Sequence, residues 1–166
     1  MPSIKDTLAK HASGEDIEAE NRREIAKSIE EMRYWGGLVA SMNPSLTSSE
    51  ADEIGSAVVK YSGQYGLSPR LIVAVIMVES SGRVSAVSPK GAKGLMQVMP
   101  FWKKELGIEG TLFDIDTNIG AGAHILAHYI NRYGFEEGIA RYYRGTLPVS
   151  GDAYIGKVQK AMESIG

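Results

Sequence analysis

The chain of 166 residues contains no cysteine. This absence excludes disulfide bonds, thiolate metal ligands and a cysteine nucleophile. A chain of this length buries about two-thirds of the surface that its unfolded form exposes, so we expect a hydrophobic core to hold the fold without cross-links. The lack of cysteine does not fix the compartment, because many exported proteins also have none.

Long hydrophobic runs and an excess of one charge are also absent. The longest apolar run, LIVAVIMV at Leu71–Val78, is too short to cross a bilayer by roughly half. The N-terminal segment MPSIKDTLAKHASGEDIEAENRRE has no apolar stretch of the signal-peptide kind. We therefore expect either a protein that stays where it is made or a sequence from which export information is missing. The net charge of −2 gives no reason to expect nucleic acid as a partner. We predict no membrane span.

Metal and phosphate motifs are incomplete. His124 and His128 have the i, i+4 spacing of paired zinc ligands, but an HExxH motif is absent and no third ligand lies nearby in the sequence. The segment from Gly91 to Gly94 lies near lysines, but it matches neither GxxxxGKS/T nor GxGxxG. We therefore predict no metal and no nucleotide cofactor, and a packing role for the two histidines.

The N-terminal part of the chain predicts a helix of its own. Ile17, Ile25 and Ile29 recur at helical spacing among charges of both signs. Such a helix either packs on the main body or acts as a coiled-coil or partner-binding arm. The turn-forming combinations at residues 35–37 (WGG) and 43–45 (NPS) predict a boundary. We accordingly divide the chain into an N-terminal helical extension (residues 1–45) and a second domain (46–166).

The second domain predicts a series of helices. Thr47 and Glu50 form a capping box, and Ser68 before Pro69 is a second helix start. The β-branched residues of Leu71–Val78 also favour a strand, but the cap favours a helix that is buried all round. Further helices are expected from Thr47 to about residue 66, after Pro100, from Asn118 to Gly134, from Glu136 to Arg144 and from Asp152 to Ser164. The segment Gly82–Gly94 is expected to be a loop or small hairpin. The fold class is therefore mainly α.

Glu79 is the one carboxylate at the end of the apolar run. The C-terminal end of a buried helix presents negative partial charge, and the apolar neighbours remove water. Both effects raise the pKa of a carboxyl group, which is what a general acid working near neutral pH requires. The alternative is that Glu79 simply leaves the core and points into solvent.

Short motifs follow Glu79 in a fixed order: Glu79-Ser80-Ser81-Gly82, then Ala86-x-Ser88, then Gly91-Ala92-x-Gly94-Leu95-Met96-Gln97-x-Met99-Pro100. This set resembles the catalytic signature of soluble lytic transglycosylases, enzymes of lysozyme-like fold that cleave the glycan strands of peptidoglycan. The resemblance continues with Asn118-Ile119-x-x-Gly122, with residues 140–145 (ARYYRG) where AxYNxG is usual, and with Tyr154-x-x-x-Val158. It extends from about Thr47 to Met162 and implies a lysozyme-like helical domain.

The resemblance implies chemistry that uses one carboxyl group. Glycosidases commonly use two carboxyl groups. Here Glu79 would protonate the oxygen that links N-acetylmuramic acid to N-acetylglucosamine. It would then take a proton from the muramoyl C6 hydroxyl, which closes a 1,6-anhydro ring on C1. No water enters the product, so no second carboxylate is needed.

The resemblance also implies substrate-binding positions, and it includes two departures. Ser88 falls at a hydroxyl near the catalytic carboxylate, Gln97 at an amide that bonds sugar or acetamido groups, Met99 at an apolar groove wall and Tyr142 at a tyrosine near the cleavage subsite. Tyr143-Arg144 replaces the usual Asn-Ala, so we expect a different groove floor. Ser150 stands where an acidic residue is frequent, which leaves donor-side binding open.

Two other functions remain open from the sequence. One is hydrolysis of peptidoglycan or chitin, as in goose-type lysozymes, and the other is a non-catalytic glycan-binding module. For all of them the expected partner is a glycan strand, and peptidoglycan would place the protein in the periplasm or cell envelope.

Overall fold

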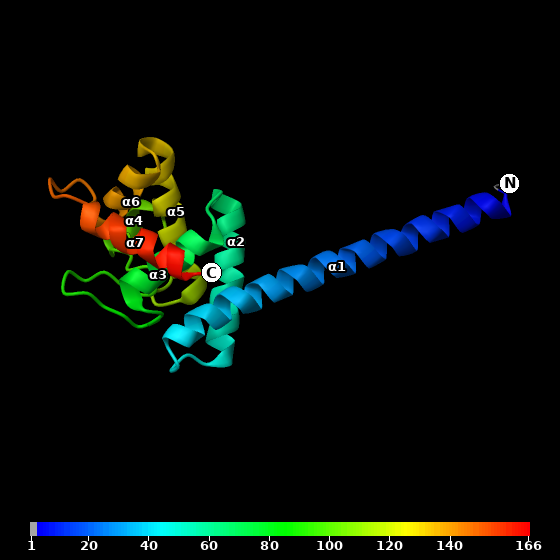
Figure 1. Ribbon diagram of the computed structural model, residues 1–166, viewed down its shortest axis with the longest axis horizontal. Helices are drawn as coiled ribbons and strands as arrows, with labels where there is room; N and C mark the ends of the chain where they lie inside the picture. The colour runs from blue at the N-terminus through cyan, green and yellow to red at the C-terminus, as the bar shows by residue number, and fades with distance from the viewer. Residues whose placement is uncertain (1–2) are drawn as a thin grey trace. The chain divides into compact units, whose positions relative to one another are not determined.

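The computed structural model describes residues 3–166, with side chains for all of these except residues 6–12. The described residues form seven α-helices (Figure 1): α1 (Ile4–Met42), α2 (Ser48–Tyr65), α3 (Pro69–Ser80), α4 (Phe101–Glu105), α5 (Ile115–Tyr133), α6 (Phe135–Arg144) and α7 (Asp152–Ser164). Within the described range, extended pairing is limited to the isolated bridges Val87–Lys93 and Lys93–Val98. The predicted mainly α fold with a small loop region is confirmed.

The predicted turn at residues 35–37 is wrong, because α1 runs through it to Met42. The two-glycine sequence serves a helix crossing instead. A Cβ atom on Gly36 would collide with the carbonyl oxygen of Ala51 in α2, and one on Gly55 would collide with that of Met32 in α1. The glycines therefore let the two backbones touch. The turn predicted at residues 43–45 is confirmed.

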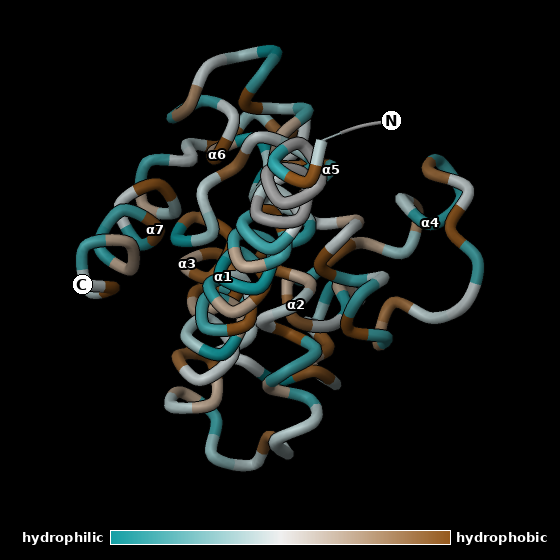
Figure 2. The backbone as a smooth tube through the Cα atoms, turned by 90° about the vertical axis from the view of Figure 1, so that its right-hand side faces the viewer, coloured by the Kyte–Doolittle hydropathy of each residue, from teal (hydrophilic) through white to brown (hydrophobic). Residues whose placement is uncertain are grey.

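The chain divides into two compact units, Met1–Glu31 and Met32–Gly166. In the first unit Ile17, Ile25 and Ile29 are exposed. Figure 2 shows α1 mostly in hydrophilic and neutral colours, with few hydrophobic segments. Whether the helical extension ends at residue 45 as a domain, and whether it binds a partner, remain predictions. No helix among the described residues has the length and hydrophobicity that a membrane span requires.

The helix starts of the second unit follow the predicted caps. Thr47 Oγ1 accepts the Glu50 N–H at 3.1 Å, and Glu50 Oε2 accepts the Thr47 N–H at 2.8 Å. Ser68 Oγ accepts the Leu71 N–H at 3.1 Å, with Pro69 in the first turn of α3. These bonds satisfy amide groups that a helix N-terminus leaves unpaired, so local sequence determines where α2 and α3 begin.

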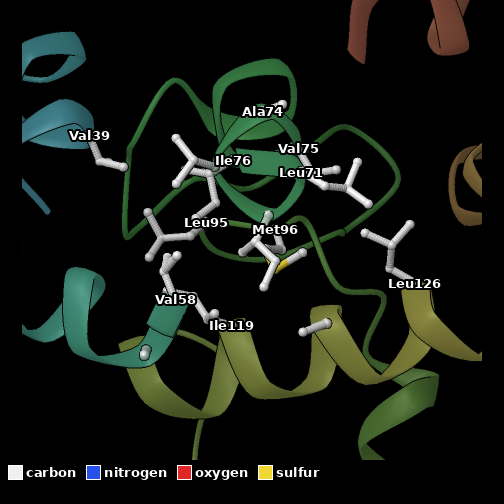
Figure 3. Close-up of a cluster of buried hydrophobic side chains, with 14 of the residues drawn as sticks. Val39, Val58, Leu71, Ala74, Val75, Ile76, Leu95, Met96, Ile119 and Leu126 are labelled. Atoms are coloured by element: carbon white, nitrogen blue, oxygen red, sulfur yellow. The ribbon is translucent and has the colours of Figure 1, made fainter. Parts of the chain in front are cut away.

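Helix α3 lies at the centre of the second unit. Residues 71–76 are all buried, which confirms the predicted helix and excludes the strand alternative. Leu95 and Met96 lie between α3 and α5, with Val58 of α2 beside them (Figure 3). Around this core α3 packs against α7, and α5 packs against both α2 and α6. The core therefore holds the C-terminal end of α3 between the loop 82–100 and α7.

Helix α5 begins three residues earlier than the predicted Asn118. Asp114 caps it, accepting the Thr117 N–H at 2.9 Å. This places Asn118 in the first turn, where it is buried. Helix α6 begins one residue before the predicted Glu136, and α7 has the predicted bounds.

Candidate active site

The five site residues predicted from sequence, Glu79, Ser88, Gln97, Met99 and Tyr142, all line one cleft of about 340 Å³. Glu79 comes from the last turn of α3, Tyr142 comes from α6, and the other three come from the loop between α3 and α4. The structure thus brings together residues that are up to 63 positions apart (142 − 79).

Glu79 is partly buried at the edge of the core. Its Oε1 accepts a hydrogen bond of 2.5 Å from the Tyr154 hydroxyl. Loss of water around the group raises the pKa of Glu79, and this outweighs the lowering by the Tyr154 hydrogen bond and by the charge of Lys157. The direction matches the sequence-based expectation. A carboxyl group whose pKa is raised in this way is suited to carry a proton near neutral pH.

Tyr154 is the site residue that the sequence reasoning missed. It lies in α7, it is buried, and its ring stacks on that of Tyr143 with centroids 4.8 Å apart and planes at 13°. Burial and the nearby Glu79 charge raise the pKa of Tyr154 well above its usual value. The hydroxyl therefore stays protonated and donates a hydrogen bond to the carboxyl oxygen. The pattern Tyr154-x-x-x-Val158, which was noted only as a helix motif, was the available signal.

Asn118 holds the loop that carries Gln97. Its Oδ1 accepts the Met96 N–H at 2.8 Å, and its Nδ2 donates to the carbonyl oxygens of Lys93 at 2.8 Å and Leu112 at 2.7 Å. Gly94, with φ of +77°, passes so close that a Cβ atom would collide with the Asn118 amide. The chain at residues 93–97 is thus fixed by one buried side chain from α5.

Ser88 and Gln97 also bond within the loop. Ser88 Oγ accepts the Ala92 N–H at 3.0 Å, as an ordinary turn serine does. Gln97 Nε2 donates to the carbonyl oxygens of Ala86 at 3.2 Å and Gly94 at 3.0 Å. With its NH₂ group used in this way, Gln97 has its carboxamide oxygen left to accept a bond from a ligand.

Tyr142 and Met99 complete the walls. The Tyr142 hydroxyl donates to the Met96 carbonyl oxygen at 2.7 Å. Burial and the charge of Glu79 raise the pKa of Tyr142 well above its usual value, so this phenol stays neutral. Met99 is partly exposed in the cleft.

The two helix histidines lie outside the cleft. His124 meets the ring of Tyr65 edge-on with centroids 5.4 Å apart, and His128 packs on Tyr129 at 5.7 Å. Within residues 3–166, apart from the undescribed side chains, no group of three or more histidine, aspartate or glutamate side chains is placed to hold a metal ion.

Known proteins that resemble this chain include transglycosylases. A protein named transglycosylase from Enterobacteria phage PRD1 is 40% identical over 114 residues, which are 66% of this chain and 41% of that protein. The solved complex of the 70-kDa soluble lytic transglycosylase with bulgecin A matches 80% of this chain and 25% of that chain, with a TM-score of 0.51 and 24% identity. An inactive mutant of the lytic transglycosylase Slt from Pseudomonas aeruginosa matches 66% of this chain and 22% of that chain, with a TM-score of 0.48 and 23% identity. The chain thus spans less than half the length of each of these proteins.

The fold likeness to the complex with bulgecin A agrees with the lysozyme-like prediction, and the sequence comparison identifies the family. The family model described as the transglycosylase SLT domain matches residues 56–160, which include every residue of the cleft. The chain therefore belongs to the transglycosylase SLT domain family.

Proposed function

We propose that the chain is a lytic transglycosylase, which cleaves the β-1,4 bond between N-acetylmuramic acid and N-acetylglucosamine and leaves a 1,6-anhydro end. One observation carries the proposal: among the described residues that line the cleft, Glu79 alone has a carboxyl group. A hydrolase with two carboxyl groups uses the second as the nucleophile or to activate water. A cleft with a single acid suits a reaction in which the substrate's own hydroxyl is the nucleophile.

In the first step Glu79 gives its proton to the glycosidic oxygen, and the bond from that oxygen to muramoyl C1 breaks. Tyr154 holds Oε1, so Oε2 is the atom left to carry the proton. In the second step the ionised Glu79 takes the proton of the muramoyl C6 hydroxyl, and O6 bonds to C1. The carboxyl group ends as it began, and atoms balance without water.

The other cleft residues bind the glycan in this proposal. The carboxamide oxygen of Gln97 accepts from a sugar hydroxyl or acetamido N–H, and Met99 offers an apolar wall. Tyr142 keeps the Met96 segment beside Glu79. Ser88 lines the cleft next to them, with its hydroxyl able to donate while it accepts from Ala92.

Mass spectrometry of the products tests the proposal. Purified cell-wall sacculi digested with the protein are expected to release muropeptides whose ends are lighter than reducing ends by one water. Reducing ends would instead establish a hydrolase of the lysozyme kind. Binding to sacculi without release of fragments would establish a glycan-binding module.

Changing Tyr154 to phenylalanine is expected to shift the pH dependence of the activity. The hydrogen bond from Tyr154 lowers the pKa of Glu79, so its loss raises that pKa further. The acid form of Glu79 then persists to higher pH, and the alkaline limb of the activity profile shifts to higher pH. We expect kcat to fall about tenfold, since one net hydrogen bond of about 1.4 kcal/mol no longer orients the acid.

Tyr61→Phe is the matched control, because the Tyr61 hydroxyl bonds the carboxylate of Asp116 at 2.8 Å outside the cleft. Tyr61→Phe should leave the pH dependence of the activity unchanged. An unchanged alkaline limb in Tyr154→Phe would contradict the role given to Tyr154.

The proposed substrate also suggests a location and a partner. Peptidoglycan lies outside the cytoplasmic membrane, so the protein acts in the periplasm or cell envelope. The exposed isoleucines of α1 support the use of this helix as an arm that binds an envelope assembly.

A further inference from the structure

We propose that Arg144 recognises a carboxylate attached to the muramoyl residue of the substrate, and so makes the enzyme selective for an acidic glycan over a neutral one. This proposal rests on the proposed function and names a specificity determinant within the same cleft. The carboxylate is either the lactyl carboxylate of a strand without peptides or a carboxylate of the stem peptide.

Arg144 is the last residue of α6, and it lines the cleft together with Glu79. Its Nη2 donates to Glu137 Oε1 at 2.6 Å, and its Nη1 donates to the Leu147 carbonyl oxygen at 3.2 Å. Its Nε is buried and has no hydrogen-bond partner among the described atoms. A guanidinium group has five N–H donors, so three remain unused. Nε is closed to solvent, so a ligand in the cleft would be met by the second N–H of Nη1 and of Nη2, which the protein does not use.

In the described ion pairs the charge of Arg144 is only partly offset. Glu137 Oε1 also accepts from Arg141 Nε at 2.8 Å, so one carboxylate serves two guanidinium groups. Lys90 lines the same cleft, and the positive charge of Lys157 is close enough to Glu79 to lower its pKa. When Glu79 is protonated, as its role as acid requires, the cleft carries net positive charge, although the whole chain has a net charge of −2.

The chemistry of the glycan supplies the matching group. N-acetylglucosamine is neutral, whereas muramic acid carries a lactyl ether that ends in a carboxyl group, free or extended by a peptide with carboxylates of its own. A planar guanidinium group with free N–H donors binds a carboxylate through paired, charge-assisted hydrogen bonds. A polymer of N-acetylglucosamine alone offers no such partner.

The test compares wild-type protein, Arg144→Gln and Arg141→Gln on three forms of the same strands. These are strands with intact stem peptides, strands freed of peptides by an amidase, and the freed strands with their carboxylates converted to neutral amides. KM and kcat are measured from the release of soluble fragments. Binding to each form is measured in parallel in a Glu79→Gln background.

We expect the wild-type protein to prefer acidic over neutralised strands by about 10- to 100-fold in kcat/KM, the usual contribution of a hydrogen bond to a charged group. Arg144→Gln should lose this preference through a higher KM. Arg141→Gln should keep it, because Arg141 shares Glu137 but does not line the cleft. Better use of intact strands identifies the stem carboxylate as the group bound, and better use of peptide-free strands identifies the lactyl group.

Equal use of acidic and neutralised strands by the wild-type protein would overturn the proposal, whether or not Arg144→Gln folds. An equal loss in Arg144→Gln and Arg141→Gln would also overturn it, since the effect would then come from the shared Glu137. If no strand is cleaved, the proposed function fails by itself. The parallel binding measurements still decide whether the cleft distinguishes acidic from neutral glycan.

Discussion

Glu79→Gln is expected to abolish the release of fragments from cell-wall sacculi. Glutamine has nearly the same shape as glutamate. In the wild-type protein the Tyr154 hydroxyl lies 2.5 Å from Glu79 Oε1, and the glutamine carbonyl oxygen can accept the same hydrogen bond. It neither gives a proton to the leaving oxygen nor takes one from the C6 hydroxyl. Acid–base catalysis typically contributes about 10²–10⁴-fold. Because one side chain would serve both of the proposed steps, we expect a loss of at least about 10³-fold, measured as soluble product against time.

The same variant should be at least as stable as the wild-type protein at neutral pH. The folded protein holds the Glu79 proton more tightly than the unfolded chain, since burial raises the pKa of Glu79 in the folded state. The stability that the protonated group contributes is therefore complete below the unfolded pKa and is lost as pH rises through the folded pKa. Glutamine cannot ionise, so thermal unfolding of Glu79→Gln should show its advantage at neutral pH and none in acid.

Glu105→Gln, which changes an exposed glutamate of α4, is the control for activity and should behave as the wild-type protein. Retained activity in a folded Glu79→Gln protein would remove Glu79 from the chemistry. The one-acid mechanism would fail with it.

Asn118→Ala is expected to lower the free energy of unfolding by about 2–6 kcal/mol. The alanine leaves two backbone groups without partners, the Met96 N–H and the Leu112 carbonyl oxygen. The Lys93 carbonyl oxygen loses its bond to Asn118 but still accepts the Val98 N–H at 3.0 Å. Each buried polar group that loses its partner costs about 1–3 kcal/mol. Typical domains are stable by only about 5–15 kcal/mol, so this single change should bring the protein close to unfolding. Urea denaturation followed by circular dichroism measures it.

Asn131→Ala, on an exposed turn of the same helix, makes the same substitution without the buried bonds. Its effect should stay within about 0.5 kcal/mol. Asn118→Asp should cost at least as much as Asn118→Ala, because it keeps the acceptor for Met96 but places a buried carboxylate oxygen against two carbonyl oxygens. A cost of Asn118→Ala no larger than that of Asn131→Ala would show that water replaces the amide.

The sequence predicted the parts of this structure that depend on neighbouring residues. The caps at Thr47 and Ser68 bond amides three residues away, so their signals are contained within one turn. Glu79 was found because the run before it is apolar and the motifs after it keep a fixed order. That order was enough to predict a set of residues that share one cleft.

Two of the errors and omissions involve distant partners, and the third is a local signal that was overlooked. The glycines of residues 35–37 suggested a turn. Their actual role depends on the carbonyl oxygen of Ala51, which lies on another helix and leaves no room for a Cβ atom on Gly36. The bond from Tyr154 to Glu79 joins residues 75 positions apart, and the pattern Tyr154-x-x-x-Val158 indicated only a helix. The start of α5 was misplaced because Asp114 was not recognised as its cap.

The C-terminal end of α1 supports the turn that follows Glu79. The Asn43 Nδ2 donates to the Gly82 carbonyl oxygen at 3.0 Å, a Cβ atom on Gly82 would touch Val39, and Trp35 and Val39 belong to the core. A fragment trimmed to begin at Leu46 would lose these contacts, and the turn that follows Glu79 would be less firmly held. The shortest self-sufficient catalytic fragment should therefore begin within α1, at about Met32, and engineered fusions should join the chain ahead of that residue.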